Sequence, residues 1–419
     1  MQAAAAKQAG GWRQWVEPWY LPYALAGAST GGLVGILLPL AATQEGGASY
    51  VGVVMAAVSA GMLSAVVWGG LADRLHAHRA IFGGGILLAA VAVALLALEP
   101  NRAVSLLLAL AIGAGNAAYT TVANLLVVEA HPKAEWNLRL GWLQTFYGGG
   151  LALGLLLASP LSRVPPREGL VVTAVLAALA GAVGWWLTRA LPPSAKRLAV
   201  PQQLTAPADW AHGAVEHTRR HSLSTFLSAA SRTLRSRFGV FLAVVVVANV
   251  GLSGVYALFP LMMQRVFDVD PSRSSVVYSV GMWLGLTLYS PAGQLSNRYG
   301  AARVFQASVA VRMLAVSALA LLGVTQLPGR DWLALLAFLP VTLGYATMSV
   351  SSTSLASELS SADEGAGMGL FNASSGLTQL VGTATGGWVA HTLGYNALSV
   401  FAAAALGAGL ALALLLPKR

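Results

Sequence analysis

Long apolar windows separated by short polar breaks run through most of the chain. A helix that crosses a hydrocarbon core of ~30 Å needs about 20 apolar residues. Windows of that length predict helical spans over residues 20–42, 49–72, 80–98, 103–128, 140–162, 169–189, 239–263, 275–296, 304–325, 332–357, 366–390 and 396–416. The pattern therefore predicts an all-α polytopic membrane protein with twelve transmembrane helices.

The composition agrees with a membrane protein, and it excludes several classes of function. Of 419 residues, 56% are hydrophobic and only 10% are charged, against roughly 25% charged residues in soluble domains. The 46 glycines suit closely packed membrane helices. The chain has no cysteine, which excludes disulfides, thiolate metal sites and cysteine nucleophiles.

The basic residues set the expected orientation. If the first residues are cytoplasmic, eighteen Lys and Arg residues fall in inside segments and six in outside segments. Cytoplasmic loops are enriched in Lys and Arg, so we expect both termini in the cytoplasm and the protein in the plasma (inner) membrane. The net charge of +10 is then explained by basic residues in the cytoplasmic segments of a membrane protein. We therefore expect no nucleic-acid partner.

One long connection divides the spans into six and six. The expected organisation is a six-helix half over residues 1–190, a cytoplasmic linker over 191–238 and a second six-helix half over 239–419, related by pseudo-two-fold symmetry. The first part of the linker is proline-rich, which favours an extended chain. Its second part predicts an interfacial amphipathic helix; a disordered basic linker is the alternative. The apolar face of that helix would hold Leu223, Phe226, Leu227, Leu234 and Phe238.

A short basic loop occurs twice, 224 residues apart. After the second span the chain has Gly69, then Asp73 and Arg74, then Arg79; after the eighth it has Gly293, then Asn297 and Arg298, then Arg303. Glu129 and Glu358 end the fourth and tenth spans, which are equivalent positions in the two halves. Consecutive halves of the same orientation are typical of transporters in which one half moves against the other.

These loops resemble the signature of the major facilitator superfamily between its second and third helices and its copy between the eighth and ninth. The resemblance covers nearly the whole chain. It implies a cytoplasmic charge network that closes the inner side, carried here by Asp73, Arg74, Arg79, Glu129, Arg298, Arg303 and Glu358. His76 stands where the family usually has Gly, and Asn297 where it has an acid, so the network should be weaker in the second half.

The motifs that the resemblance associates with drug exporters are incomplete. Alanines 109 and 111 occupy the expected arginine positions of the fourth span. The glycine pairs Gly150 with Gly154 and Gly382 with Gly386 have the small-xxx-small spacing, for which we expect close helix packing.

Neutral polar side chains recur at helical spacing inside several spans. A polar group facing lipid is costly, so such stripes predict either a cavity or helix-to-helix hydrogen bonds without a ligand. The candidate cavity residues are Asn116, Tyr119, Thr120, Asn124, Gln144, Tyr147, Asn249, Ser253, Tyr256, Tyr345, Ser349, Asn372, Ser375 and Gln379.

Ionisable groups are nearly missing from the spans. No Asp or Glu lies mid-span, and Arg312 is the only deep charge. Its side chain could meet substrate or extend to the cytoplasmic interface. A coupling proton is therefore left open as a partner.

Together these features predict a secondary transporter that moves a small organic solute by alternating access. Export of amphipathic compounds is slightly favoured, with import of a polar nutrient such as a sugar as the alternative. The other classes are a non-transporting membrane enzyme and a lipid scramblase. We expect a small-molecule substrate and a lipid bilayer as partners, and no catalytic residue, cofactor or metal, because the spans offer no base-activated nucleophile or ligand cluster.

Overall fold

The computed structural model describes residues 15–75, 77–98, 101–132, 135–190, 236–325, 327–359 and 364–414. Within these ranges the chain forms helices and no strand. The helices are α2 (Tyr20–Ala26), η2 (Gly27–Leu33), α3 (Val34–Met62), α4 (Ala65–Leu75), α5 (His78–Leu96), α6 (Arg102–Ala130), α7 (Trp136–Leu161), α8 (Pro166–Leu187), η4 (Thr188–Ala190), α11 (Arg237–Phe267), α12 (Pro271–Tyr299), α13 (Ala301–Val324), α14 (Arg330–Leu359), α15 (Glu364–Leu393) and α16 (Asn396–Ala413).

Several helices begin one to four residues before the apolar windows, and for α6 and α12 a polar cap lies just outside the window. The side chain of Asn101 accepts a hydrogen bond from the Val104 N–H at 3.1 Å and starts α6. Asp270 accepts from the Ser272 N–H at 2.7 Å and starts α12. Such caps satisfy backbone N–H groups that have no partner in the first turn.

The first two predicted spans are two helical passes that meet at a sharp bend. Residues Tyr20–Ala72 make up 53 consecutive positions, and the change of direction occurs at Gly47, whose φ of 66° lies in the left-handed region. Glycine adopts this conformation without steric cost. A π-helical segment, η2, lies in the first pass.

By length and composition, nine of the helices described are able to cross a membrane, and the Tyr20–Ala72 run counts as one of them. Helices α12 and α15 are not among the nine. The twelve-helix prediction is therefore not fully shown, although each predicted window falls on a helix. Exposed apolar side chains cover the outer helix faces, as expected where lipid is the solvent: Val91, Leu107, Val171, Leu314 and Val400.

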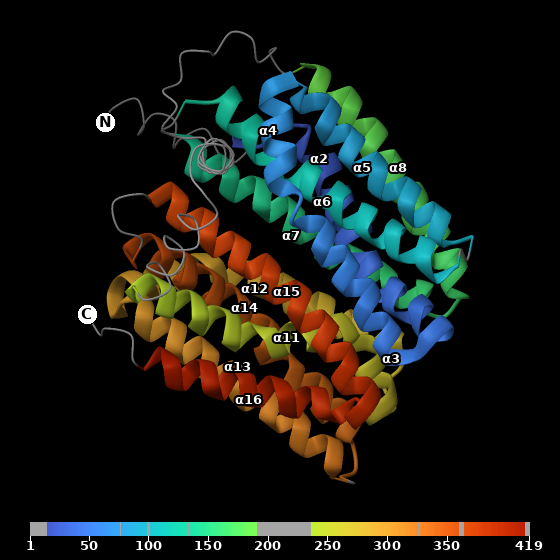
Figure 1. Ribbon diagram of the computed structural model, residues 1–419, viewed down its shortest axis with the longest axis vertical. Helices are drawn as coiled ribbons and strands as arrows, with labels where there is room; N and C mark the ends of the chain where they lie inside the picture. Colours follow the sequence, from blue (N-terminus) through green and yellow to red (C-terminus); the bar gives the residue numbers. More distant parts are fainter. Residues whose placement is uncertain are drawn as a thin grey trace, which may run out of the picture.

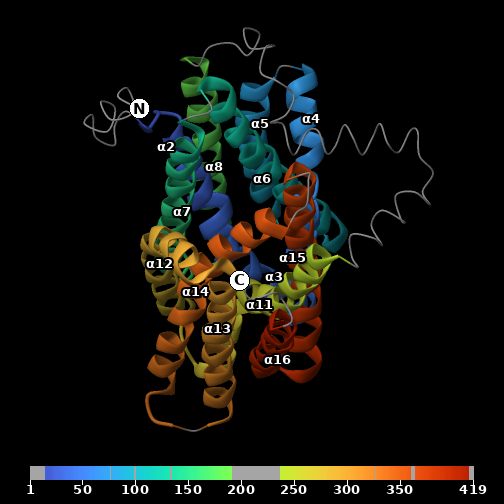
Figure 2. The ribbon, with the colours of Figure 1, turned by 90° about the vertical axis from the view of Figure 1, so that its left-hand side faces the viewer.

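The helices form two sets, which Figures 1 and 2 show side by side: α2–α8 in blue to green and α11–α16 in yellow to red. Because successive helices run back and forth, the bundle has two ends. We call the end with the start of α2 and the end of α16 the terminal side, and the end with the Gly47 bend the opposite side. Contacts agree with this assignment: Gln306 donates to the Ala413 carbonyl at 2.7 Å on the terminal side, and Arg330 pairs with Asp268 at 2.9 Å on the opposite side.

Glycines allow close packing within each set. A Cβ on Gly150 or Gly154 would collide with a backbone carbonyl oxygen of the first pass. In the second set, Gly382 lies against the Val250 carbonyl and Gly386 lies against Gly254. The predicted role of both glycine pairs in close helix packing is confirmed.

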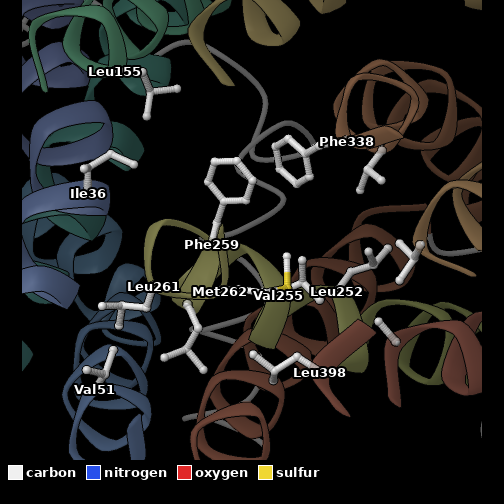
Figure 3. Packing of buried hydrophobic residues seen from close by; sticks show 14 of the residues in the cluster. Ile36, Val51, Leu155, Leu252, Val255, Phe259, Leu261, Met262, Phe338 and Leu398 are labelled. Atoms are coloured by element: carbon white, nitrogen blue, oxygen red, sulfur yellow. The ribbon is translucent and has the colours of Figure 1, made fainter. Parts of the chain in front are cut away.

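The two sets meet on the opposite side. Gly52 of α3 lies against Gly387 of α15 so closely that a Cβ on either would collide with the other. Ser159 of α7 and Ser272 of α12 share a hydrogen bond of 2.6 Å. Buried apolar residues from both sets complete this contact, and Figure 3 shows Val51 of α3 beside Leu261 of α11.

Some predictions fall outside the described residues. The linker over 191–235, including most of the predicted amphipathic helix, is among them. Phe238, its last predicted apolar residue, lies in α11 and is buried.

Candidate functional site

A cavity of about 600 Å³ lies between the two helix sets. It is bounded toward the opposite side by the Gly52–Gly387 and Ser159–Ser272 contacts. The side chains of Tyr345 and Asn372 are exposed although they line it. The cavity is therefore reached by solvent from the terminal side.

The two walls of the cavity differ in chemistry. The wall from the first set is mostly apolar and includes Val34, Met55 and Leu151. The wall from the second set is mostly polar and carries hydroxyl, amide, phenol and guanidinium groups from α11 to α15. A solute in the cavity would make most of its directional contacts with the second set.

Ten of the fourteen candidate cavity residues line this space. They come from both sets and from five helices, and they are Asn116, Tyr147, Asn249, Ser253, Tyr256, Tyr345, Ser349, Asn372, Ser375 and Gln379. The helical spacing of the polar stripes thus brings residues far apart in the sequence to one cavity.

The other four candidates are not among the lining residues and bond to neighbouring groups. Tyr119 is fully buried, and its hydroxyl shares a 2.8 Å hydrogen bond with Thr30. Thr120 donates to the Asn116 carbonyl at 2.6 Å. Asn124 donates to the Thr120 carbonyl at 3.0 Å and accepts from Gln144 at 3.3 Å. These contacts match the alternative of bonding within and between helices.

The sequence stripes missed several lining residues. Thr30 and Gly31 belong to η2, where the wider π-helical turn breaks the usual spacing. Tyr278 of α12 lines the cavity beside Tyr256, with ring centroids 6.0 Å apart. The four-residue spacing from Ser274 to Tyr278 within α12 was the available signal.

Arg312 also lines the cavity. The possibility that its side chain extends to the cytoplasmic interface is wrong, because the residue is 1% exposed and lies near the middle of α13. Neighbouring α11 and α14 supply its contacts, so the guanidinium is directed inward.

Only some residues of the predicted cytoplasmic charge network have side chains in the described part of the structure. The side chains of Asp73, Arg74 and Glu129 lie outside the described part of the structure. Arg79 donates to the Arg189 carbonyl at 3.5 Å, and Arg298 lies over the Tyr299 ring at 5.2 Å. Arg303 and Glu358 are exposed, and no ion pair joins these two within the described ranges.

A second charged cluster, which the sequence did not reveal, lies on the terminal side of the first set. Glu17 contacts His131 and accepts hydrogen bonds from Trp19 at 2.8 Å and Arg139 at 3.4 Å. Burial would raise the pKa of the Glu17 carboxyl, but these hydrogen bonds and positive charges lower it below its usual value. The cluster ties the chain before α2 to the α6–α7 connection.

These features define a class of protein: a helical integral membrane protein with a solvent-accessible cavity between two helix sets, as found in solute transporters. Residues 20–364 match the model of the Major Facilitator Superfamily, and the chain belongs to this superfamily of transporters. A search of curated proteins found no match.

Solved transporters share the fold. A point mutant of the nucleoside transporter NupG is 16% identical with a TM-score of 0.73, covering 96% of this chain and 100% of that one. A D-xylose-proton symporter is 16% identical with a TM-score of 0.68, covering 96% of this chain and 97% of that one. The xylose transporter XylE from E. coli, in an inward-open conformation, is 14% identical with a TM-score of 0.68, covering 96% and 95%.

Proposed function

We propose that this chain is a secondary transporter that carries a small polar organic solute across the membrane by alternating access. The observation that supports the proposal is the cavity between the two helix sets, open toward the terminal side and bounded by contacts on the opposite side. Its volume of about 600 Å³ lies within the range of small-molecule sites. The two halves, residues 1–190 and 239–419, would move against each other about this cavity.

We assign the terminal side to the cytoplasm, because the basic residues of the sequence concentrate there. The conformation described would then be inward-facing. The charge network around Asp73 would close the terminal side in the other state, with Arg298, Arg303 and Glu358 contributing from the second half.

Uptake of a polar solute is the direction that we favour. The second-set wall offers mostly hydrogen-bonding groups, and the solved proteins of the same fold are named as nucleoside and xylose transporters. The middle of each span lacks Asp and Glu, so the proposal includes no proton coupling.

Efflux of amphipathic compounds is the second candidate. The apolar first-set wall with Val34, Met55 and Leu151 favours it, because an amphipathic solute could place its apolar face there. Loss of preloaded solute from cells that express the protein, without saturable uptake, would favour this function over uptake.

Asn372 provides a test of the transport site. It lies on α15, is exposed and lines the cavity. Replacing Asn372 by Leu removes a hydrogen-bonding group, and we expect about tenfold slower uptake, equivalent to about 1.4 kcal/mol. The measurement is uptake into proteoliposomes of a labelled solute first identified by a thermal-shift screen.

Thr385→Val is the matched control on the same helix. Thr385 is half-buried, donates to the Val381 carbonyl at 2.8 Å and is not a lining residue, so uptake should be unchanged. If Asn372→Leu and Thr385→Val both transport like the wild type, the cavity is not the transport site.

A further inference from the structure

Arg312 is a buried cation in the middle of a membrane-spanning helix. Its side chain is 1% exposed and passes over Gly344 of α14, where a Cβ would approach the arginine Cγ and Cδ at 2.6 and 2.9 Å. The structure therefore holds a long charged side chain in a packed position that only a glycine on α14 allows.

In the described ranges, the partners of the guanidinium are neutral. One terminal nitrogen donates to Asn249 Oδ1 at 3.5 Å and to Met348 Sδ at 2.8 Å. The other donates to the Tyr256 hydroxyl at 3.0 Å, and that hydroxyl donates onward to the Val341 carbonyl at 3.1 Å. Nε is buried and has no acceptor among the described residues.

No carboxylate in the described part of the chain is placed to balance the charge. The acidic residues of the second half lie at helix ends and turns. The ion pairs that the described ones form are Arg273 with Asp331 and Arg330 with Asp268, both on the opposite side. Removing an ion from water costs several kcal/mol unless an opposite charge compensates, and a charge within a span is by default a functional group.

The guanidinium of Arg312 lies at the cavity, because its neutral partners also line the cavity. Asn249, Tyr256 and Met348 line the same space as Arg312. A guanidinium has only donors and matches the planar geometry of carboxylate and phosphate oxygens. A ligand oxyanion in this cavity would supply the counter-charge that the described residues do not provide.

We propose that Arg312 binds an oxyanion group, carboxylate or phosphate, of the transported solute, which is therefore a small organic anion. This inference rests on the proposed transport function and specifies its substrate class. It makes Arg312 a binding residue, with Asn249 and Tyr256 as positioning residues that hold the guanidinium from α11.

The competing explanation is that Arg312 has a structural role only, and that its hydrogen bonds hold α13 against α11 and α14. Pairs of compounds that differ in one charged group separate the two explanations on the wild-type protein, without relying on a variant that could fail to fold. The probes are succinate and succinamide, benzoate and benzamide, glucose and glucose 6-phosphate, and uridine and uridine monophosphate, at equal ionic strength.

Thermal-shift titration of the purified full chain should show at least tenfold tighter binding for the anion of one pair than for its neutral partner. Binding of carboxylates alone assigns a carboxylate, and binding of phosphates alone assigns a phosphate. Arg312→Gln should abolish this preference. Arg273→Gln, which removes an arginine 60% exposed on the opposite side, should keep it.

Equal binding of both members of every pair, or binding of no anion, would overturn the proposal. Transport in proteoliposomes is measured in parallel. A neutral solute that is bound and transported would refute the role of Arg312 and leave the transport function standing. An anion that is bound but never transported would refute the transport function instead.

Discussion

At the scale of the residue, Arg312 and Gly344 act as a pair. The arginine stem occupies the space that a side chain on α14 would otherwise fill. The sequence predicted a deep charge but not its direction, because an arginine near the middle of an apolar helix can face lipid, a neighbouring helix or a cavity. Only the packing of α13 against α14 decides among them.

Gly344→Ala should test this pairing. The added methyl group must displace the Arg312 stem, and overpacking of this kind costs about 1–3 kcal/mol. We expect a clearly lower melting temperature in detergent. Gly84→Ala on α5 is the control, because a Cβ there meets no atom within 4 Å; its melting temperature should be unchanged or slightly raised. Equal melting temperatures for both variants would contradict the packing described.

At the scale of the element, the apolar windows predicted the helices because the thickness of the bilayer fixes their length. The same windows could not predict η2 or the left-handed backbone at the Gly47 bend, since neither changes the apolar composition. The polar stripes predicted ten lining residues. Hydrogen-bonded positions such as Asn124 and Gln144 carry the same pattern, so helical spacing alone could not distinguish them from the cavity.

The contact between α7 and α12 allows a test of movement at this scale. Ser159 and Ser272 are hydrogen-bonded at 2.6 Å, and the chain has no cysteine. Replacing both serines by cysteine should give a disulfide under mild oxidation, since the side chains are within bonding reach. We expect uptake to fall at least tenfold and to recover with dithiothreitol, because the opposite side can no longer open.

The single variants Ser159→Cys and Ser272→Cys are the controls and should respond to neither reagent. A cross-link that forms fully while uptake continues unchanged would show that α7 and α12 stay together throughout transport.

At the scale of the whole molecule, the orientation of the protein in the membrane determines whether the open terminal side faces the cytoplasm or the outside. If the terminal side is cytoplasmic, a cysteine introduced at Gln202 in the cysteine-free chain should be labelled by an impermeant maleimide only after the cells are permeabilised. A cysteine at Thr392, an exposed position in the last turn of α15 on the opposite side, should be labelled in intact cells. The reverse pattern would invert the assignment and make the conformation outward-facing.

The neutral surroundings of Arg312 among the described residues have an electrical consequence for the whole cycle. A monovalent anion bound to the guanidinium makes the site neutral, whereas the empty site carries one positive charge. A membrane potential acts on charge at about 2.3 kcal/mol per elementary charge per 100 mV for a full crossing of the membrane. If the chain carries such an anion as proposed, voltage acts on the reorientation of the empty carrier and leaves the loaded carrier nearly unaffected. Net movement of the solute then depends on voltage, and one-for-one exchange between the two sides of the membrane does not.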